Sequence, residues 1–151
     1  MSKSAVEKLD GRKTVQTETA IVFADGGSRG NPGPAGAGAV IMVNGAIVES
    51  VCKFCGNTTN NVAEYTGLII GMEKALELGF KHVQVRMDSE LVVRQMIGQY
   101  KVKNEKLIPL FRQAQSLSAK FARFDIQHVR REYNKDADRL ANEAMDKGCA
   151  G

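Results

Sequence analysis

The feature that most constrains the fold is a continuous apolar run at residues 20–24, which ends abruptly at Asp25, Gly26 and Gly27. A short apolar run between polar segments is typical of a strand that is buried on both faces. Such a strand needs hydrogen-bonding partners on both sides and a layer of structure on each face. The chain is therefore expected to form a sheet covered by helices, with Asp25 at the carboxyl end of its first strand.

The rest of the chain supplies the other strands and helices of such a sheet. Asn44-Gly45 is a strong hairpin signal, because both residues readily adopt the positive φ of a tight turn, and it joins predicted strands at 38–43 and 46–54. Further strands are predicted at 82–87 and 124–129, and helices at 62–78, 89–97, 105–121 and 134–147. The order β-β-β-α-β-α-α-β-α predicts an α/β fold with a mixed sheet.

Length and charge predict one intracellular domain. The chain has 151 residues, with a flexible tail expected at 1–18 and the folded domain at 19–148. The net charge of +4 is compatible with a polyanionic partner without requiring one. No apolar run approaches the ~20 residues of a membrane span, and the N-terminus lacks the apolar core of a secretory signal. We therefore expect a cytoplasmic monomer with no membrane and no protein partner.

Four acidic residues stand where predicted strands end or predicted helices begin: Asp25, Glu64, Asp88 and Asp138. Asp25 and Asp88 follow strands, and ligands of such sheets gather outside the carboxyl ends of the strands. Locally, Asp25 could be a turn former and Asp88 a helix cap. Glu64 could belong to a capping box, and Asp138 could be an acid that the helix dipole stabilises in the first turn. Their joint placement instead indicates one crevice, in which a divalent cation offsets their repulsion.

The fourth acid has a competitor, because Asp136 lies in the same helical turn as Asp138. The core stripe of this helix is expected to include Ala137, Leu140 and Ala141. Asp138 borders that stripe, whereas Asp136 has the placement of a solvated acid in the first turn. We therefore prefer Asp138.

Four segments together resemble ribonuclease H type 1. They are residues 25–34 (D-G-G-S-R-G-N-P-G-P), 58–64 (T-T-N-N-V-A-E), 88–90 (D-S-E) and 137–141 (A-D-R-L-A), in the order of the family. The resemblance implies a ribonuclease H-like fold, with a five-stranded mixed sheet in the order 3-2-1-4-5 and strand 2 antiparallel. It also implies an endoribonuclease that hydrolyses the RNA strand of RNA–DNA hybrids and leaves 5′-phosphate and 3′-hydroxyl ends.

The resemblance also assigns roles to single residues. Asp25, Glu64, Asp88 and Asp138 would be catalytic and would hold two Mg²⁺ ions, for which Mn²⁺ can substitute. Two adjacent ions suit an in-line displacement at phosphorus. Substrate contacts are expected from Gly26, Gly27, Ser28, Asn31, Asn60, Asn61, Ser89, Glu90, Lys101, Lys103 and Arg131. Turn and cap chemistry is the alternative for the asparagines, and an ordinary solvated loop is the alternative for the lysines.

Two departures from the pattern of many members indicate a shorter, archaeal-like branch. The loop before the last helix (130–135) lacks the mobile histidine of the family, and Arg131 or Glu132 would replace it. His128 precedes this loop and is interpreted as a strand residue. The connector at 99–106 is brief where many members carry a basic protrusion, and the chain has no Trp. An inactive binding module, a nuclease domain from a reverse transcriptase and a different metal-dependent nuclease remain rival interpretations. The presence of all four acids disfavours the first.

Overall fold

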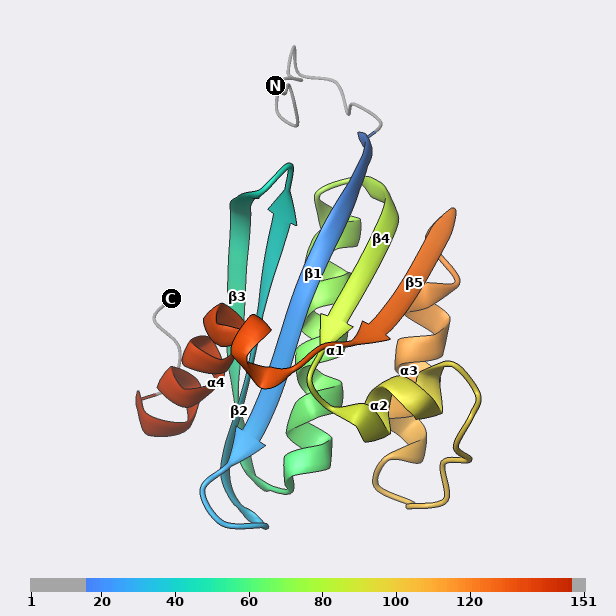
Figure 1. Ribbon diagram of the computed structural model, residues 1–151. Coiled ribbons are helices and arrows are strands. Elements are labelled where there is room, and N and C mark those ends of the chain that lie inside the picture. Colours follow the sequence, from blue (N-terminus) through green and yellow to red (C-terminus); the bar gives the residue numbers. More distant parts are fainter. Residues whose placement is uncertain (1–15, 148–151) are drawn as a thin grey trace.

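The computed structural model of the chain describes residues 16–147. Five strands form one sheet in the order β3-β2-β1-β4-β5 (Figure 1). The strands are β1 (Gln16–Ser28), β2 (Gly33–Val43), β3 (Ala46–Thr58), β4 (Phe80–Met87) and β5 (Arg123–His128). β2 is antiparallel to both β1 and β3, whereas β4 runs parallel to β1 and β5. The predicted strand order and the antiparallel second strand are therefore confirmed.

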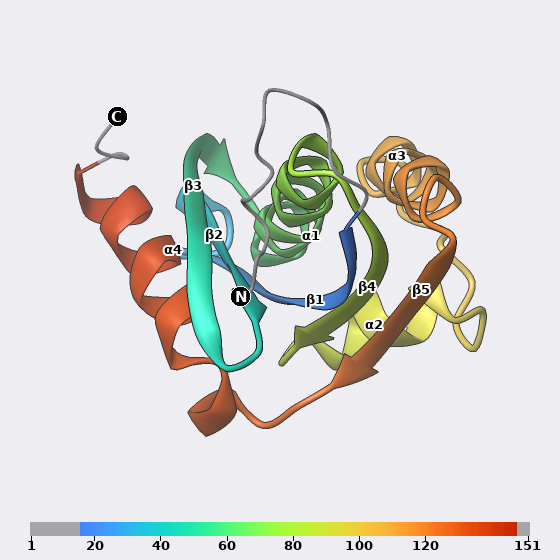
Figure 2. The same ribbon diagram turned by 90° about the horizontal axis from the view of Figure 1, so that it is seen from above.

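Helices cover both faces of this sheet. They are α1 (Asn60–Glu77), α2 (Glu90–Met96), α3 (Ile108–Ser118) and α4 (Lys135–Lys147), with a short 3₁₀ helix, η1 (Arg131–Tyr133), before α4. Figure 2 shows α1 and α3 on one side of the sheet and α4 on the other. The core between α1 and the sheet is fully apolar at its centre, where Val22, Leu68 and Met72 are completely buried. No helix within residues 16–147 has the length and apolar character needed to cross a membrane.

Glycines allow the helices to lie unusually close to the strands that carry the site. A Cβ added at Gly26 of β1 would overlap the backbone carbonyl of Ala63 in α1. On the other face, a Cβ at Gly38 of β2 would lie 2.5 Å from the Cβ of Leu140 in α4. Because a glycine lacks this atom, the backbones of helix and strand can approach. The close approach brings α1 and α4 to the edge of β1 where Asp25 lies.

The local signals of the sequence explain most element boundaries. Asn44 and Gly45 have φ of 52° and 82°, as a type I′ hairpin requires. The Thr59 hydroxyl accepts a hydrogen bond from the Val62 N–H and caps α1, and Gly79 follows that helix with φ of 90°. The hairpin at Asn44-Gly45 was predicted, as was the end of the helix near residue 78.

Several boundaries differ from the prediction: β2 begins at Gly33 rather than at 38, β3 runs to Thr58 rather than to 54, and α3 ends at Ser118 rather than at 121. β1 continues past the apolar run to Ser28, because Gly26, Gly27 and Ser28 still pair with residues 35–37 of β2. α3 begins at Ile108, three residues after the predicted start at Glu105, because the carbonyl of Asn104 accepts hydrogen bonds from Leu107 and Ile108 in a separate turn. The predicted tail at 1–18 falls mostly outside the described residues, as does Gly148 at the predicted end of the domain.

Candidate active site at the carboxyl edge of the sheet

A pocket of about 390 Å³ opens beside the carboxyl end of β4, and all four predicted carboxylates line it. Asp25 belongs to β1 and Glu64 to α1, whereas Asp88 directly follows β4 and Asp138 lies in the first turn of α4. Because β1 and β4 are parallel neighbours, Asp25 and Asp88 reach the same edge of the sheet. The fold thus brings together acids that are more than a hundred residues apart in the sequence.

Burial and a neighbouring charge make Asp25 hold its proton more tightly than an ordinary aspartate. The Asp25 side chain is buried, and its Oδ1 accepts a hydrogen bond of 2.8 Å from the Gly26 N–H. Burial, then the charge of Asp88 and a hydrogen bond with Asp138, raise the pKa of Asp25 to about 8, although the Gly26 N–H opposes the shift. A metal-free pocket therefore resists having all of its carboxyl groups ionised at once.

Glu64 shows the same effect from the α1 side of the pocket. The pKa of Glu64 is raised to about 7, mainly by burial and to a lesser extent by the charge of Asp88. The Ser89 hydroxyl donates a 3.0 Å hydrogen bond to Glu64 Oε1, and this bond opposes the shift. Ser89 is itself buried and also caps α2 by accepting from the Val92 N–H at 3.3 Å. Ser89 therefore links the start of α2 to a pocket carboxylate.

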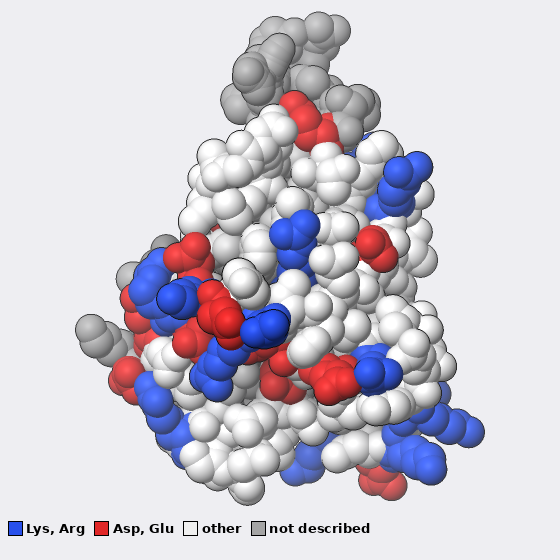
Figure 3. Space-filling view, in the orientation of Figure 1, with Lys and Arg blue, Asp and Glu red and all other residues white. Residues whose placement is uncertain are grey.

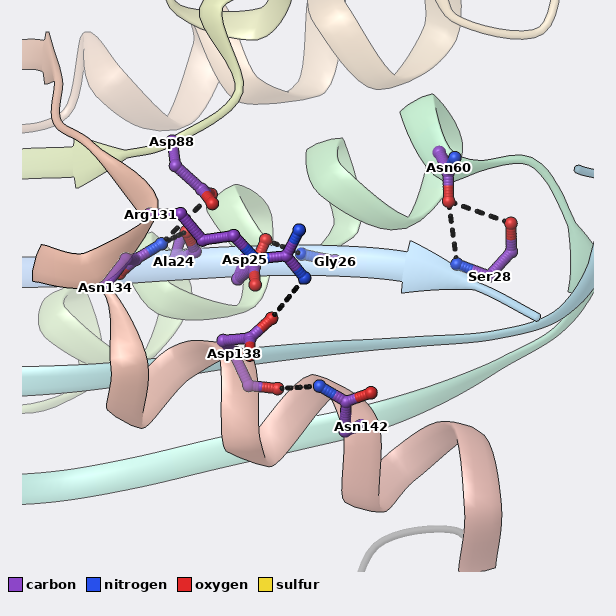
Figure 4. A network of polar contacts seen from close by, with 10 residues as sticks. All are labelled: Ala24, Asp25, Gly26, Ser28, Asn60, Asp88, Arg131, Asn134, Asp138 and Asn142. Carbon is purple, nitrogen blue, oxygen red and sulfur yellow. Dashed lines mark hydrogen bonds and ion pairs between the residues drawn. The ribbon is translucent and has the colours of Figure 1, made fainter. Parts of the chain in front are cut away.

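Asp138, rather than Asp136, faces the pocket. Arg131 Nη2 donates to Asp138 Oδ1 at 3.1 Å, and Figure 4 shows the Arg131 side chain among Asp25, Asp88 and Asp138. The charges of these acids, Asp138 foremost, raise the pKa of Arg131. Asp136 lies 3.9 Å from Arg139 on the exposed side of α4. The geometry supports the preference for Asp138 and places the Arg131 guanidinium beside the acids.

The donor atoms of the pocket suit a hard divalent cation, because Mg²⁺ prefers oxygen ligands. Among residues 16–147, however, no three acidic, histidine or cysteine side chains are already placed as a ligand set for one ion. Mg²⁺ sites typically keep several waters and use one or two carboxylates together with substrate phosphate. The pocket therefore fits Mg²⁺ by donor chemistry and charge, although its side chains do not form a closed cage.

The predicted substrate residues divide into two groups. Gly26, Gly27, Ser28, Asn60 and Arg131 line the pocket with the acids. The others do not line it: Asn31, Asn61, Ser89, Glu90, Lys101 and Lys103.

Hydrogen bonds join two members of the second group to the pocket: Ser89 through Glu64, and Asn31 through Asn60 at the rim. Asn60 Oδ1 accepts from the backbone N–H of Ser28 at 2.8 Å and from its hydroxyl at 2.9 Å (Figure 4). Asn31 Oδ1 in turn accepts from the Asn60 N–H at 3.1 Å. These bonds tie the glycine-rich turn to the start of α1.

Glu90, Lys101 and Lys103 of the second group do not contact the acids of the pocket. Glu90 pairs with Arg94 at 2.8 Å on the surface of α2. Lys101 and Lys103 are exposed in the connector between α2 and α3, and Figure 3 shows basic side chains gathered there, at the lower right. His128 lies in β5, as predicted, and does not line the pocket.

Sequence reasoning missed several residues at the site. Arg29 and Met145 line the pocket, and Arg29 forms a 2.7 Å ion pair with Asp146. Asn142 Nδ2 donates to the backbone carbonyl of Asp138 at 2.8 Å. Two signals were present: Arg29 lies inside the glycine-rich segment, and Asn142 follows Asp138 by one helical turn. Asn134 was predicted only as the start of the last helix, at 134–147, but its amide contacts Asp88.

Known proteins resemble the chain in both sequence and structure. The family described as "Reverse transcriptase-like" matches residues 23–144. The chain is 50% identical over 128 residues to Bifunctional protein Rv2228c of Mycobacterium tuberculosis, a match that covers 83% of this chain but only 35% of that protein. It is 42% identical over 125 residues to Ribonuclease HI of Halobacterium salinarum, covering 82% of this chain and 63% of that one.

Solved structures agree with these matches. The N-terminal RNase H domain of Rv2228c from Mycobacterium tuberculosis superposes with a TM-score of 0.85 at 48% identity, covering 87% of this chain and 96% of that one. LC11-RNase H1, solved in complex with an RNA/DNA hybrid, gives a TM-score of 0.80 at 45% identity and covers 85% and 97%. The chain thus spans about a third of the mycobacterial protein and matches its RNase H part. Fold, pocket and relatives together establish that the chain belongs to the ribonuclease H type 1 family.

Proposed function

We propose that the protein is an endoribonuclease that hydrolyses the RNA strand of RNA–DNA hybrids, with Asp25, Glu64, Asp88 and Asp138 holding two Mg²⁺ ions. The observation that carries this proposal is the meeting of the four carboxylates, from four separate elements, in one pocket. The relative LC11-RNase H1, solved with an RNA/DNA hybrid at 45% identity, supports the choice of substrate.

The chemistry follows from the charge of the pocket. When bound, a pair of Mg²⁺ ions activates a water and stabilises the leaving oxygen of an in-line displacement. The carboxylates hold that charge at the edge of the sheet. Burial first, and then the charge of Asp88, raise the pKa of Asp25 and of Glu64, so a positive charge in the pocket favours their ionised forms. Hydrolysis that displaces the 3′ oxygen leaves a 5′-phosphate on one product and a 3′-hydroxyl on the other.

Arg131 is the best candidate to replace the histidine that the loop lacks. Its side chain is 75% exposed and pairs with Asp138, so it can turn from that acid toward a scissile phosphate once cations neutralise the pocket. Glu132 is the weaker candidate, because it pairs with Arg130 at 3.6 Å and does not line the pocket. The role that we assign to Arg131 is to bind the phosphate and balance charge.

Recognition of RNA requires groups that sense the 2′-hydroxyl. Asn60 offers its Nδ2 for this purpose, because its Oδ1 is already held by Ser28 and the nitrogen donates to no group within residues 16–147. The backbone of Gly26 and Gly27 can approach the RNA strand closely. Lys101 and Lys103 are assigned to the phosphates of the DNA strand.

A cleavage assay tests the proposal. Labelled hybrid, duplex DNA, duplex RNA and single strands are incubated with Mg²⁺, Mn²⁺ or EDTA, with wild type, Asp25→Asn and Asp138→Asn. We expect metal-dependent cutting of the RNA strand of the hybrid and a loss of roughly 100-fold or more in each variant, because a group that holds transition-state charge is lost.

Asp136→Asn is the matched control, since it removes the same charge from the same turn of α4 on the exposed side. It should cut like wild type. Cutting by Asp25→Asn at the wild-type rate would refute the assignment of the site, and equal cutting of duplex DNA would indicate a different nuclease. Tight binding of hybrid without cutting would indicate a binding module.

A further inference from the structure

Asn134 is a buried amide at the junction of η1 and α4, only 1% exposed. Its Nδ2 donates to the backbone carbonyl of Ala24 at 2.9 Å and to Oδ1 of Asp88 at 3.3 Å (Figure 4). Because both partners are acceptors, the nitrogen of the amide must face them. The orientation of the side chain is therefore fixed by its neighbours.

The other end of this amide is unusual. Asn134 Oδ1 is buried and makes no hydrogen bond within the described part of the chain, although an asparagine at this position usually caps the helix with that oxygen. The backbone carbonyl of Asn134 accepts from the Asp138 N–H at 3.1 Å, which is the ordinary first bond of the helix. The side-chain oxygen makes no capping bond, and the side-chain nitrogen donates to the Ala24 carbonyl of β1 and to Asp88. A buried polar atom left unsatisfied calls for a functional reason.

The three contacts of Asn134 reach three parts of the acidic pocket. Ala24 directly precedes Asp25 in β1, the Asp88 carboxylate is bound directly, and Asp138 is reached through its N–H. One residue therefore joins the end of β1, the residue after β4 and the first turn of α4. β1 and β4 are already held together by their own strand pairing, so the side chain of Asn134 adds the placement of the start of α4 against their carboxyl ends.

We propose that Asn134 is a positioning residue of the active site, which orients the Asp88 carboxylate and fixes the start of α4, with Asp138, against β1. This inference rests on the proposed function, because it takes Asp25, Asp88 and Asp138 as metal ligands. Groups that hold a ligand in place typically change metal affinity or activity by about 10–100-fold when they are removed. Asn134 should act through Asp88 and Asp138 and leave hybrid binding unchanged.

The test compares wild type with Asn134→Ala in two measurements. Binding of Mn²⁺ alone, without substrate, is followed by the electron paramagnetic resonance of the free ion, and kcat and KM for hybrid cleavage are measured in Mg²⁺. We expect weaker Mn²⁺ binding and a kcat reduced by about 10–100-fold, with KM for the hybrid near the wild-type value.

Tyr65→Phe is the control for a purely structural role. It removes another buried hydrogen bond, the 2.6 Å bond from the Tyr65 hydroxyl to Gln95 Oε1, which has no contact with a pocket carboxylate. This variant should unfold at a lower temperature but keep the wild-type kcat and Mn²⁺ affinity. If Asn134→Ala behaved in the same way, the proposal would be wrong.

A second variant guards against poor folding of Asn134→Ala. Asn134→Asp keeps the shape of the side chain but replaces the donor nitrogen with an oxygen, so its kcat should also fall by about tenfold or more. A wild-type kcat in this variant would overturn the proposal. If Asp25→Asn loses cleavage while both Asn134 variants keep it, only the positioning role fails. If Asp25→Asn keeps cleavage, the assignment of the carboxylates fails.

Discussion

At the scale of single residues, the main property of the pocket is the cost of ionising carboxyl groups that are buried close together. The pKa values of Asp25 and Glu64 are raised well above their ordinary values, and burial is the main cause for both. Arg131 supplies one positive charge beside them, through Asp138. The remaining negative charge has to be met by bound protons or by metal ions, which makes the stability of the metal-free protein sensitive to pH.

We expect the metal-free protein to lose stability as pH rises from about 4 toward 8. The pKa of Asp25 is raised from 3.8 to about 8, and that of Glu64 from 4.5 to about 7, so the folded state binds more protons than the unfolded state across this window. The free energy of unfolding therefore falls as pH increases, and each kcal/mol lost lowers Tm by roughly 2–4 °C at this size.

Thermal unfolding in EDTA measures this slope, and Mg²⁺ should raise Tm most at the alkaline end, because it binds only the folded state. Asp25→Asn should flatten the slope, whereas Asp136→Asn should leave it as in wild type. A Tm in EDTA that stays level or rises across the window would contradict the expectation.

At the scale of elements, most of the site could be predicted because its acids stand next to clear boundaries. The apolar run before Asp25 and the β-rich run before Asp88 each indicate a strand end, and parallel strands bring their ends to one edge. The role of Asn134 could not be predicted, because its partners Ala24 and Asp88 depend on how α4 meets the sheet. An asparagine at the start of a helix predicts a side-chain cap, but the sequence does not show whether its oxygen makes that bond, and in Asn134 it does not.

The approach of α4 to β2 was equally hidden in the sequence, because glycines within a strand usually indicate a bulge or a weak strand. We expect Gly38→Ala to push α4 away from the sheet, since the new Cβ would lie 2.5 Å from Leu140 Cβ and 3.0 Å from the Ala137 carbonyl. Overpacking of this kind costs about 1–3 kcal/mol. Because Asp138 follows Ala137, cleavage activity should fall further than the loss of stability explains.

Gly56→Ala is the control for this prediction. Gly56 has open space around it but a φ of +77°, so alanine there is strained by about 1–2 kcal/mol without displacing a helix. Chemical denaturation and initial cleavage rates, measured where both variants are folded, separate the two effects. Full activity in Gly38→Ala together with reduced stability would show that the position of α4 tolerates the shift.

At the scale of the whole molecule, the acidic pocket and the net charge of +4 act in opposite directions on a polyanionic substrate. The carboxylates repel phosphates, so attraction has to come from basic groups around the pocket. In Figure 3 such groups are gathered over the connector between α2 and α3, which includes Lys101 and Lys103. This connector is brief, so binding should rely on few contacts and should weaken steeply with salt.

The last prediction concerns this connector. If Lys101 and Lys103 each contact a phosphate, the double variant Lys101→Ala/Lys103→Ala should bind hybrid more weakly at low salt, and the slope of log K against log salt should become shallower by about 1 per contact. The matched control is Lys81→Ala/Lys120→Ala, which removes the same charge near the starts of β4 and β5, at the opposite edge of the sheet. Titration of hybrid in Ca²⁺, followed by fluorescence anisotropy at several salt concentrations, measures both slopes. Equal slopes in the two double variants would show that general charge, rather than the connector, attracts the substrate.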